Sequence, residues 1–165
     1  MRELSCTRLV ELLKAQDLTL AAAESCTGGW FAKSMVDVAG ASAVFYGGVV
    51  SYVNEVKEGL LGVSAELLAK YTAVSAPCAA AMADGVRACT GADIGISVTG
   101  LAGPVGGTDA IPVGRVFIGI SRPGTETETV MLTLAGGRED IRRAAVAHMI
   151  EELEKRLGEL PYETF

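Results

Sequence analysis

The residues best suited to chemistry lie in segment 21–31, where an apolar run meets Glu-Ser-Cys-Thr-Gly-Gly. Residues 18–23 are short and apolar, which predicts a buried strand, and the apolar spacing over 30–39 predicts a helix. Ser25 would then stand at a strand end and face a helix N-terminus. Free backbone N–H groups and the helix dipole favour an anion or a developing oxyanion there. The segment indicates either a nucleophilic serine or, more simply, a helix cap at Ser25 or Thr27 with glycines that permit the turn.

A nucleophilic serine needs a base, and Lys57 is the natural candidate. The single histidine, His148, falls in the last predicted helix, where a lone histidine usually lies on the surface or packs. With Asn54 as the helix cap, Lys57 would occupy the third helical position, where the dipole lowers the pKa of a cation. Partial burial lowers that pKa further, and a neutral amine can accept the proton of a serine hydroxyl. The alternative is a solvated surface lysine.

Cys26, the neighbour of Ser25, is a rival nucleophile. A thiol at a helix N-terminus has a lowered pKa, which favours the reactive thiolate. If Ser25 points out of the turn, however, Cys26 points into the core, where free cysteines usually lie. We therefore expect the serine to carry the reaction.

Two further segments suggest an anion-binding surface. Arg138 follows Gly-Gly at 136–137 and begins the last predicted helix, so it could pair with a phosphate or, equally well, with Glu139 or another carboxylate. The loop 100–114 holds five glycines and two prolines and is longer than most connections, which favours a functional role. Within it, backbone N–H groups of Gly-Gly-Thr at 106–108 could line a phosphate or a ring, or simply form a turn.

The elements that must position these residues alternate along the chain. Helices are predicted over 2–15, 30–39, 55–61, 65–70, 75–88 and 139–157, and strands over 18–23, 44–53, 93–99, 116–121 and 128–134. The last two strands flank the turn 122–125, which predicts an antiparallel hairpin. The fold class is therefore α/β, a three-layer α/β/α sandwich with a mixed, mostly parallel sheet and one antiparallel hairpin.

Composition limits the functions that the chain can have. With 165 residues and 50% hydrophobic content, we expect a single domain over 1–165. The net charge of −6 argues against binding bulk nucleic acid or an anionic membrane surface. No secretion signal or membrane-length apolar stretch is seen, so we expect a cytoplasmic protein. The mean hydropathy of +0.36 suggests a homo-oligomer.

The side chains that could hold a metal are too few and too scattered. The four cysteines form no Cys-x-x-Cys pair, and we expect reduced, mostly buried thiols. With a single histidine and no cluster of Cys, His and carboxylates, neither a metal site nor a cofactor is predicted.

Three motifs, in one order along the chain, resemble the CinA carboxy-terminal domain family over nearly the whole chain. They are Ala-Glu-Ser-Cys-Thr-Gly-Gly at 23–29, Ser-Tyr-Val-Asn-Glu-Val-Lys at 51–57, and Thr-Gly-Leu-Ala-Gly-Pro at 99–104 with Gly-Gly-Thr at 106–108 and Pro-Val-Gly at 112–114. Members of this family with the activity are nicotinamide-nucleotide amidases, which convert nicotinamide mononucleotide to nicotinate mononucleotide and ammonia. The resemblance implies an amidohydrolase of pyridine-nucleotide recycling, in a stand-alone form without the amino-terminal domain of longer CinA proteins.

The resemblance also implies roles for residues. Ser25 would be the nucleophile, Lys57 the base, Tyr52 a residue that orients them or relays protons, and Arg138 a phosphate ligand. The expected oxyanion and substrate contacts are Cys26, Thr27, Gly28, Gly29, Asn54, Thr99, Gly100, Gly106, Gly107, Thr108 and Arg138.

The chain departs from the family pattern at three positions. Ile111 stands where the family commonly has Lys, Ala76 where it has an acidic residue, and Gly137 where it has Asp. These departures bear on substrate affinity more than on chemistry. They leave open a non-catalytic nucleotide-binding or regulatory module, whereas a competence or DNA-damage scaffold fits the acidic balance less well.

Overall fold

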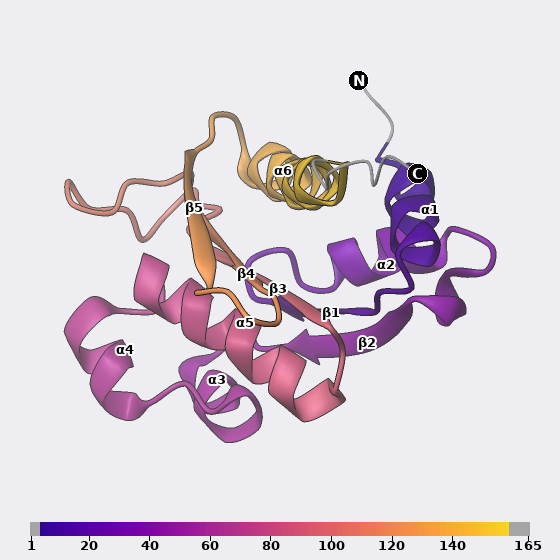
Figure 1. The fold of residues 1–165 in the computed structure, drawn as a ribbon. Helices are drawn as coiled ribbons and strands as arrows, with labels where there is room; N and C mark the ends of the chain where they lie inside the picture. Colours follow the sequence, from indigo (N-terminus) through magenta and orange to yellow (C-terminus); the bar gives the residue numbers. More distant parts are fainter. Residues whose placement is uncertain (1–3, 159–165) are drawn as a thin grey trace.

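The computed structural model of the chain describes residues 4–158. Strands and helices alternate along most of the chain (Figure 1). In order, the elements are α1 (Thr7–Ala15), β1 (Leu20–Glu24), α2 (Trp30–Val36), the 3-10 helix η1 (Ala41–Ala43), β2 (Phe45–Val50), α3 (Asn54–Leu61), α4 (Ala65–Tyr71), α5 (Ala76–Thr90), β3 (Ile94–Gly100), β4 (Arg115–Ser121), β5 (Glu128–Thr133) and α6 (Arg138–Gly158).

Within the described residues, one five-stranded sheet has the order β2-β1-β3-β4-β5. Strand β1 pairs in parallel with β2 and β3, while β4 runs antiparallel to β3 and β5. Only β4 therefore runs against the other strands, and the predicted α/β fold with a mixed, mostly parallel sheet and an antiparallel hairpin is confirmed. The carboxyl ends of β1, β2 and β3 meet at one edge of the sheet, which is where open α/β sheets bind ligands.

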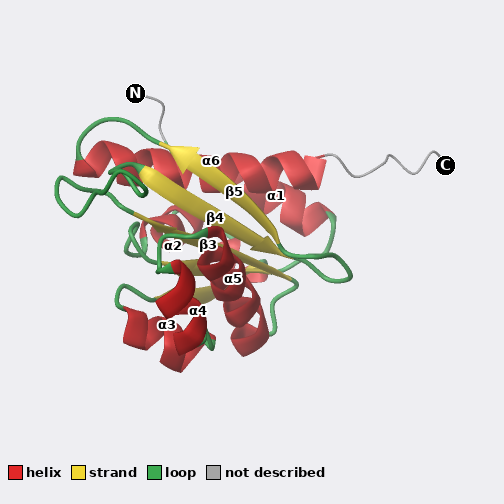
Figure 2. Cartoon of the chain, turned by 90° about the vertical axis from the view of Figure 1, so that its left-hand side faces the viewer, coloured by secondary structure: helices red, strands yellow, loops and turns green. Residues whose placement is uncertain are grey.

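Helices cover both faces of the sheet. Figures 1 and 2 show α1, α2 and α6 on one face and α3, α4 and α5 on the other. Alternate residues of β1 enter two different cores: Leu20 and Ala22 pack on the side of α6, and Ala21 and Ala23 pack on the side of α5. A strand that is buried on both faces reads as a continuous apolar run, which explains the composition of β1.

Helix α5 lies unusually close to the sheet. A Cβ atom built on Gly95 of β3 would lie 2.3 Å from the carbonyl oxygen of Ala83, and one on Gly119 of β4 would lie 2.3 Å from that of Ala79. Side chains at these positions would push α5 away from the sheet. The glycines in the middle of these strands thus permit close helix–sheet packing.

Several predicted boundaries need correction. Helix α1 begins at Thr7 rather than at residue 2; positions 4–6 are not helical, and residues 1–3 lie outside the described chain. Helix α2 ends at Val36 rather than at 39, because the chain turns and Gly40, with φ of 83°, caps η1. Ser64 and Ser75 cap α4 and α5, since their side chains accept from the N–H groups of Leu67 and Cys78.

The start of α3 also differs from the prediction, and this affects Lys57. Val53, with extended φ and ψ of −102° and 159°, is the N-cap, and no side chain caps the helix. Asn54 is thus the first helical residue rather than the cap. Lys57 occupies the fourth helical position, where its N–H already bonds to the carbonyl of Val53 at 3.3 Å. The helix dipole therefore acts on Lys57 less than the sequence predicts.

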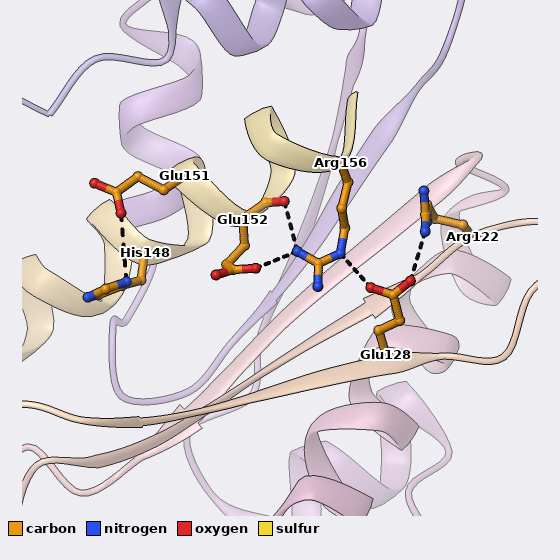
Figure 3. A network of polar contacts seen from close by, with 6 residues as sticks. All are labelled: Arg122, Glu128, His148, Glu151, Glu152 and Arg156. Atoms are coloured by element: carbon orange, nitrogen blue, oxygen red, sulfur yellow. Dashed lines mark hydrogen bonds and ion pairs between the residues drawn. The ribbon is translucent and has the colours of Figure 1, made fainter. Parts of the chain in front are cut away.

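A network of charged side chains joins the last turns of α6 to the hairpin (Figure 3). Glu128 at the start of β5 accepts from Arg156 Nε at 2.5 Å and from Arg122 Nη2 at 2.8 Å, and Arg156 also pairs with Glu152. The register of the strands places this network at the amino end of β3, away from the edge that carries Ser25.

Candidate active site

The side chains of Ser25 and Lys57 meet at the carboxyl edge of the sheet. Ser25 follows β1 directly, and its N–H donates to the carbonyl of Val98 at 3.0 Å, which fixes the backbone at the strand end. Lys57 comes from the first turns of α3, which follows β2. Its Nζ atom lies 3.1 Å from Ser25 Oγ, and its side chain is only 1% exposed.

The surroundings of Lys57 hold it ready to accept a proton. Its Nζ atom donates to the carbonyls of Ser51 at 2.7 Å and Tyr52 at 3.4 Å, and no carboxylate of the described residues pairs with it. Burial lowers the pKa of Lys57, although the electrostatic influence of Cys78 and Cys26 opposes the shift. A neutral amine has two N–H groups and one lone pair. The two carbonyls can take the N–H groups, which leaves the lone pair for the hydroxyl of Ser25.

Cys26 is held as an inert thiol. Its side chain is 6% exposed and belongs to the apolar core, as expected for a cysteine that points inward. Burial raises the pKa of Cys26 to about 11, despite its own backbone N–H and the charges of Arg142 and Lys57. The expectation of a lowered pKa at a helix N-terminus is therefore wrong. The thiol stays protonated near neutral pH, which disfavours it as the nucleophile.

The N-terminus of α2 is already occupied by a carboxylate. Glu24 is 1% exposed, and it accepts from Thr27 Oγ1 at 2.6 Å, from Phe31 N at 2.9 Å and from Ala32 N at 3.0 Å. These are the donors that the sequence suggested for a substrate anion. Sequence reasoning missed Glu24 because a carboxylate inside an apolar strand gives no sign of which donors it will meet.

The turn between β1 and α2 leaves a few backbone N–H groups for an oxyanion. The N–H of Gly28 donates to the carbonyl of Ser25 at 3.1 Å. Among the described residues, no backbone acceptor takes the N–H groups of Cys26, Thr27 or Gly29. Gly28 and Gly29, with φ of 61° and 100°, supply the left-handed backbone that the turn requires.

A cavity of about 290 Å³ opens beside Ser25 and Lys57. Eight of the predicted site residues line it, namely Ser25, Cys26, Tyr52, Asn54, Lys57, Thr99, Gly100 and Arg138. The other six, Thr27, Gly28, Gly29, Gly106, Gly107 and Thr108, do not. The prediction missed the remaining lining residues, Ala73, Val74, Leu101, Ala102, Gly103 and Val105. The motif Thr-Gly-Leu-Ala-Gly-Pro contains three of these, Leu101, Ala102 and Gly103, whereas Val105 follows it and the apolar residues before Ser75 carried no signal.

Arg138 and Tyr52 form the rim of this cavity. Arg138 is the first residue of α6; its Nη1 donates to the carbonyl of Gly103 at 2.7 Å and its Nη2 to the hydroxyl of Tyr52 at 3.0 Å. Among the described residues, Arg138 pairs with no carboxylate, and Glu139 is not its partner. The Tyr52 hydroxyl makes no hydrogen bond to Ser25 or Lys57, so it lies with the rim rather than with the reacting pair.

Other predicted ligands have structural partners. The hydroxyl of Thr99 donates to the carbonyl of Ala73 at 2.8 Å and thereby ties two walls of the cavity together. Thr108 and Ile111 close a turn on themselves, with Thr108 N donating to Ile111 O at 2.9 Å and Ile111 N to Thr108 Oγ1 at 3.0 Å. His148 lies 3.8 Å from Glu151 on α6, far along the helix from Arg138, in line with a surface role.

Metal-binding and membrane-spanning features were sought in the described part of the chain. Over residues 4–158, no group of three or more His, Cys, Asp or Glu side chains is placed to hold a metal ion. Among the same residues, no helix combines the length and the apolar composition needed to cross a membrane.

Comparison with known proteins agrees with the motifs and the fold. Among curated relatives, a CinA-like protein from Myxococcus xanthus is 44% identical over 93% of this chain, and a putative competence-damage inducible protein from Thermoanaerobacter sp. is 48% identical over 90% of it. The chain covers 36% of the length of each, so it spans about a third of these relatives.

This chain covers a larger share of the solved structures that it resembles than of the curated relatives. A competence-damaged protein (CinA) superfamily protein from Klebsiella pneumoniae aligns with a TM-score of 0.89 at 36% identity, over 93% of this chain and 96% of that one. Another from Escherichia coli aligns with a TM-score of 0.86 at 34% identity, over 89% and 85%. The family model of the CinA C-terminal domain matches residues 3–157, and the chain therefore belongs to this family.

Proposed function

We propose that this protein hydrolyses the carboxamide of nicotinamide mononucleotide to give nicotinate mononucleotide and ammonia. The observation that carries the proposal is the buried contact of 3.1 Å between Lys57 Nζ and Ser25 Oγ, without a carboxylate to hold the lysine charged. That arrangement suits a serine nucleophile with an amine base. The substrate is suggested by the resemblance of the motifs, since the names of the relatives specify no reaction.

The reaction begins when the neutral amine of Lys57 accepts the hydroxyl proton of Ser25. Ser25 Oγ attacks the carboxamide carbon, and the negative charge that develops on the carboxamide oxygen is met by the backbone N–H of Cys26, which lines the cavity. The carbonyls of Ser51 and Tyr52 stabilise the ammonium that Lys57 has become.

The second half of the reaction uses the same groups in reverse. The Lys57 ammonium gives its proton to the departing amino group, so the C–N bond breaks, ammonia leaves and a nicotinoyl ester remains on Ser25. Lys57 is then neutral again and takes a proton from water, whose oxygen attacks the ester. When the tetrahedral adduct collapses, Ser25 recovers its proton from Lys57 and nicotinate mononucleotide is released.

The charge at the cavity suits a phosphorylated substrate. Although the chain carries a net charge of −6, the rim presents Arg138 with a hydroxyl and a carbonyl as its partners and no carboxylate among the described residues. A guanidinium in such surroundings keeps its charge available for a phosphate. We assign the phosphate of the mononucleotide to this rim.

The test is ammonia release from a small panel of nicotinamide mononucleotide, nicotinamide riboside and nicotinamide. We expect turnover with the mononucleotide, none with Ser25→Ala, and most of the wild-type rate with the matched control Cys26→Ser. If the wild-type protein releases no ammonia while a related amidase does so under the same conditions, the proposal fails. Activity that is lost with Cys26→Ser and kept with Ser25→Ala would move the reaction to the thiol.

A non-catalytic nucleotide-binding or regulatory module is the second candidate, and the departures from the family pattern at Ala76, Ile111 and Gly137 favour it. Calorimetric binding of the mononucleotide without any ammonia release would support this candidate over the amidase.

A further inference from the structure

Arg142, one turn after Arg138 on α6, contacts the turn that carries Ser25. Its Nε atom donates to the carbonyl of Cys26 at 2.9 Å, and its Nη2 atom to the carbonyl of Thr27 at 3.1 Å. The same Nη2 atom would lie 3.5 Å from a Cβ atom built on Gly28, so the guanidinium packs directly against the turn. Neither the motifs nor the comparisons give Arg142 a role.

The guanidinium is itself held in place. Its carbon lies 5.5 Å from the centre of the Trp30 ring, within the range of a cation–π contact. The side chain pairs with no carboxylate among the described residues. The planar fork of an arginine, fixed by a ring, can therefore hold two carbonyls at a set distance, which the single ammonium of a lysine cannot do.

These bonds fix the orientation of the peptide between Cys26 and Thr27. The peptide between Cys26 and Thr27 is trans, and a trans peptide points its N–H opposite to its C=O. With the Cys26 carbonyl turned to Arg142, the Thr27 N–H points away from α6, which lies on the opposite face of the sheet from the helix of Lys57. That N–H is one of the few in the turn without a backbone acceptor among the described residues.

The buried carboxylate of Glu24 also fixes this turn. Glu24 holds the Thr27 hydroxyl and the first N–H groups of α2, while Arg142 holds the carbonyls on the other side. We propose that Arg142 is a positioning residue, which fixes the turn after Ser25 so that Ser25 Oγ and the Cys26 N–H at the cavity wall keep the orientation that attack and oxyanion binding require. This inference rests on the proposed function for its substrate, but its geometry concerns any attack by Ser25.

The chain offers a matched control for this residue. Arg143 lies 5.3 Å from the same Trp30 ring but donates no hydrogen bond to the turn among the described residues. Arg143→Ala therefore removes an equal charge and an equal ring contact. Only Arg142→Ala also frees the carbonyls of Cys26 and Thr27.

The experiment measures two rates on folded protein. The first is ammonia release from nicotinamide mononucleotide. The second is labelling of Ser25 by a fluorophosphonate, in which Ser25 Oγ bonds to phosphorus, fluoride leaves and Lys57 takes the hydroxyl proton. The labelling reaction needs the same oxyanion donors but not the natural substrate, so it separates this inference from the proposed function.

For Arg142→Ala we expect kcat and the labelling rate to fall together, by about 10- to 100-fold, which is less than the ~100- to 1,000-fold loss on removing an oxyanion donor outright. KM should change by less than about threefold, because the turn holds the transition state rather than the bound substrate. Arg142→Lys should be intermediate, and millimolar guanidinium should partly restore Arg142→Ala. Arg143→Ala should stay within about twofold of wild type.

Every remaining outcome of the two measurements either supports or overturns the positioning role of Arg142. Labelling of the wild-type serine without ammonia release, slowed by Arg142→Ala alone, would reject the amidase and keep the positioning role. Wild-type rates in a folded Arg142→Ala, or equal losses in Arg143→Ala, would overturn the role. So would a wild-type serine that is not labelled at all. If Arg142→Ala does not fold, Arg142→Lys gives the same comparison with the charge retained.

Discussion

Two cations at opposite ends of the sheet, Lys57 buried and Arg156 partly buried, have opposite surroundings. Arg156, near the amino end of β3, bonds to Glu128 and Glu152, and these carboxylates raise its pKa despite its burial (Figure 3). Lys57, at the carboxyl end of β1, meets two carbonyls and a hydroxyl, and burial lowers its pKa. A paired charge stabilises a fold, whereas an unpaired one is available for proton transfer.

The same contrast extends to the neighbouring arginines. Arg122 pairs with Glu128, while Arg138 and Arg142 bond only to carbonyls and a hydroxyl among the described residues. The carboxyl edge of the sheet therefore gathers cations without counter-ions, in a chain with a net charge of −6. The carboxyl edge is therefore suited to binding an anionic substrate, whereas the paired charges at the other end of the sheet stabilise the fold.

The largest expected effect comes from removing each of these two cations in turn. Lys57→Met should lower kcat by about 1,000-fold or more, as loss of a catalytic base does in acyl-transfer enzymes. Its free energy of unfolding should change by no more than about 1 kcal/mol, because relief from burying a charge offsets the lost bonds to two carbonyls.

Arg156→Met should give the reverse pattern. Activity should stay near wild type, while the free energy of unfolding falls by about 1–3 kcal/mol through loss of charged hydrogen bonds. Urea unfolding and ammonia release measured on both variants check the pair. A stable Arg156→Met, or a Lys57→Met that unfolds readily, would remove the contrast between the two ends.

The next effect concerns the rim. Arg138→Ala should raise the KM for the mononucleotide by about 10- to 100-fold, from a charge-assisted contact of ~1.5–3 kcal/mol. The riboside, which lacks the phosphate, should be affected by less than about twofold. Steady-state kinetics on both substrates make the comparison, and Arg122→Ala at the other end serves as the control. Equal losses on both substrates would take Arg138 out of the phosphate site.

The smallest effects lie in the pH dependence of stability, and the two ends act in different windows. Hydrogen bonding to Arg156, with Arg122, lowers the pKa of Glu128 below its ordinary 4.5. That contribution is present above pH 4.5 and is lost as the pH falls, so Glu128→Gln should flatten the acid side of the curve.

On the alkaline side, Lys57 acts through a lowered pKa. The unfolded chain binds the proton more tightly, so stability should rise with pH toward 10.5, by at most ~1.4 kcal/mol per pH unit. Lys57→Met should lack this rise. The comparison belongs between pH 7 and 9, where the buried thiols of Cys26 and Cys78, with pKa values of about 11, remain protonated. A wild-type curve that matches Lys57→Met in this window would contradict the lowered pKa.

Local signals in the sequence predicted most of the fold. The apolar runs of β1 and β3, the start of the helix near Ser75 and the turn after β4 each depend on residues close in the chain, and each lies close to where it is expected. The predicted boundaries of helices are wrong where two local rules compete. Asn54 is a good cap, but the extended Val53 before it takes that place and moves Lys57 one position further into the helix.

The candidate site was predictable as a set of motifs but not as a geometry. The sequence marked Ser25 and Lys57, but it did not show that the Thr27 hydroxyl would donate to Glu24. Arg142 contacts a carbonyl 116 residues away in the chain, a separation that no periodicity or spacing reports. Contacts between distant elements, and the burial that shifts a pKa, exist only once the layers have packed.

The central claim is that Lys57 is a neutral base for Ser25 rather than a fixed positive charge. The most direct measurement is kcat/KM for nicotinamide mononucleotide against pH, in the wild type and in Lys57→Arg, which keeps the charge but cannot lose its proton. We predict that wild-type activity rises with pH through a pKa below 10.5, and that Lys57→Arg is nearly inactive at every pH. An arginine variant with a large share of wild-type turnover and the same pH profile would contradict the account.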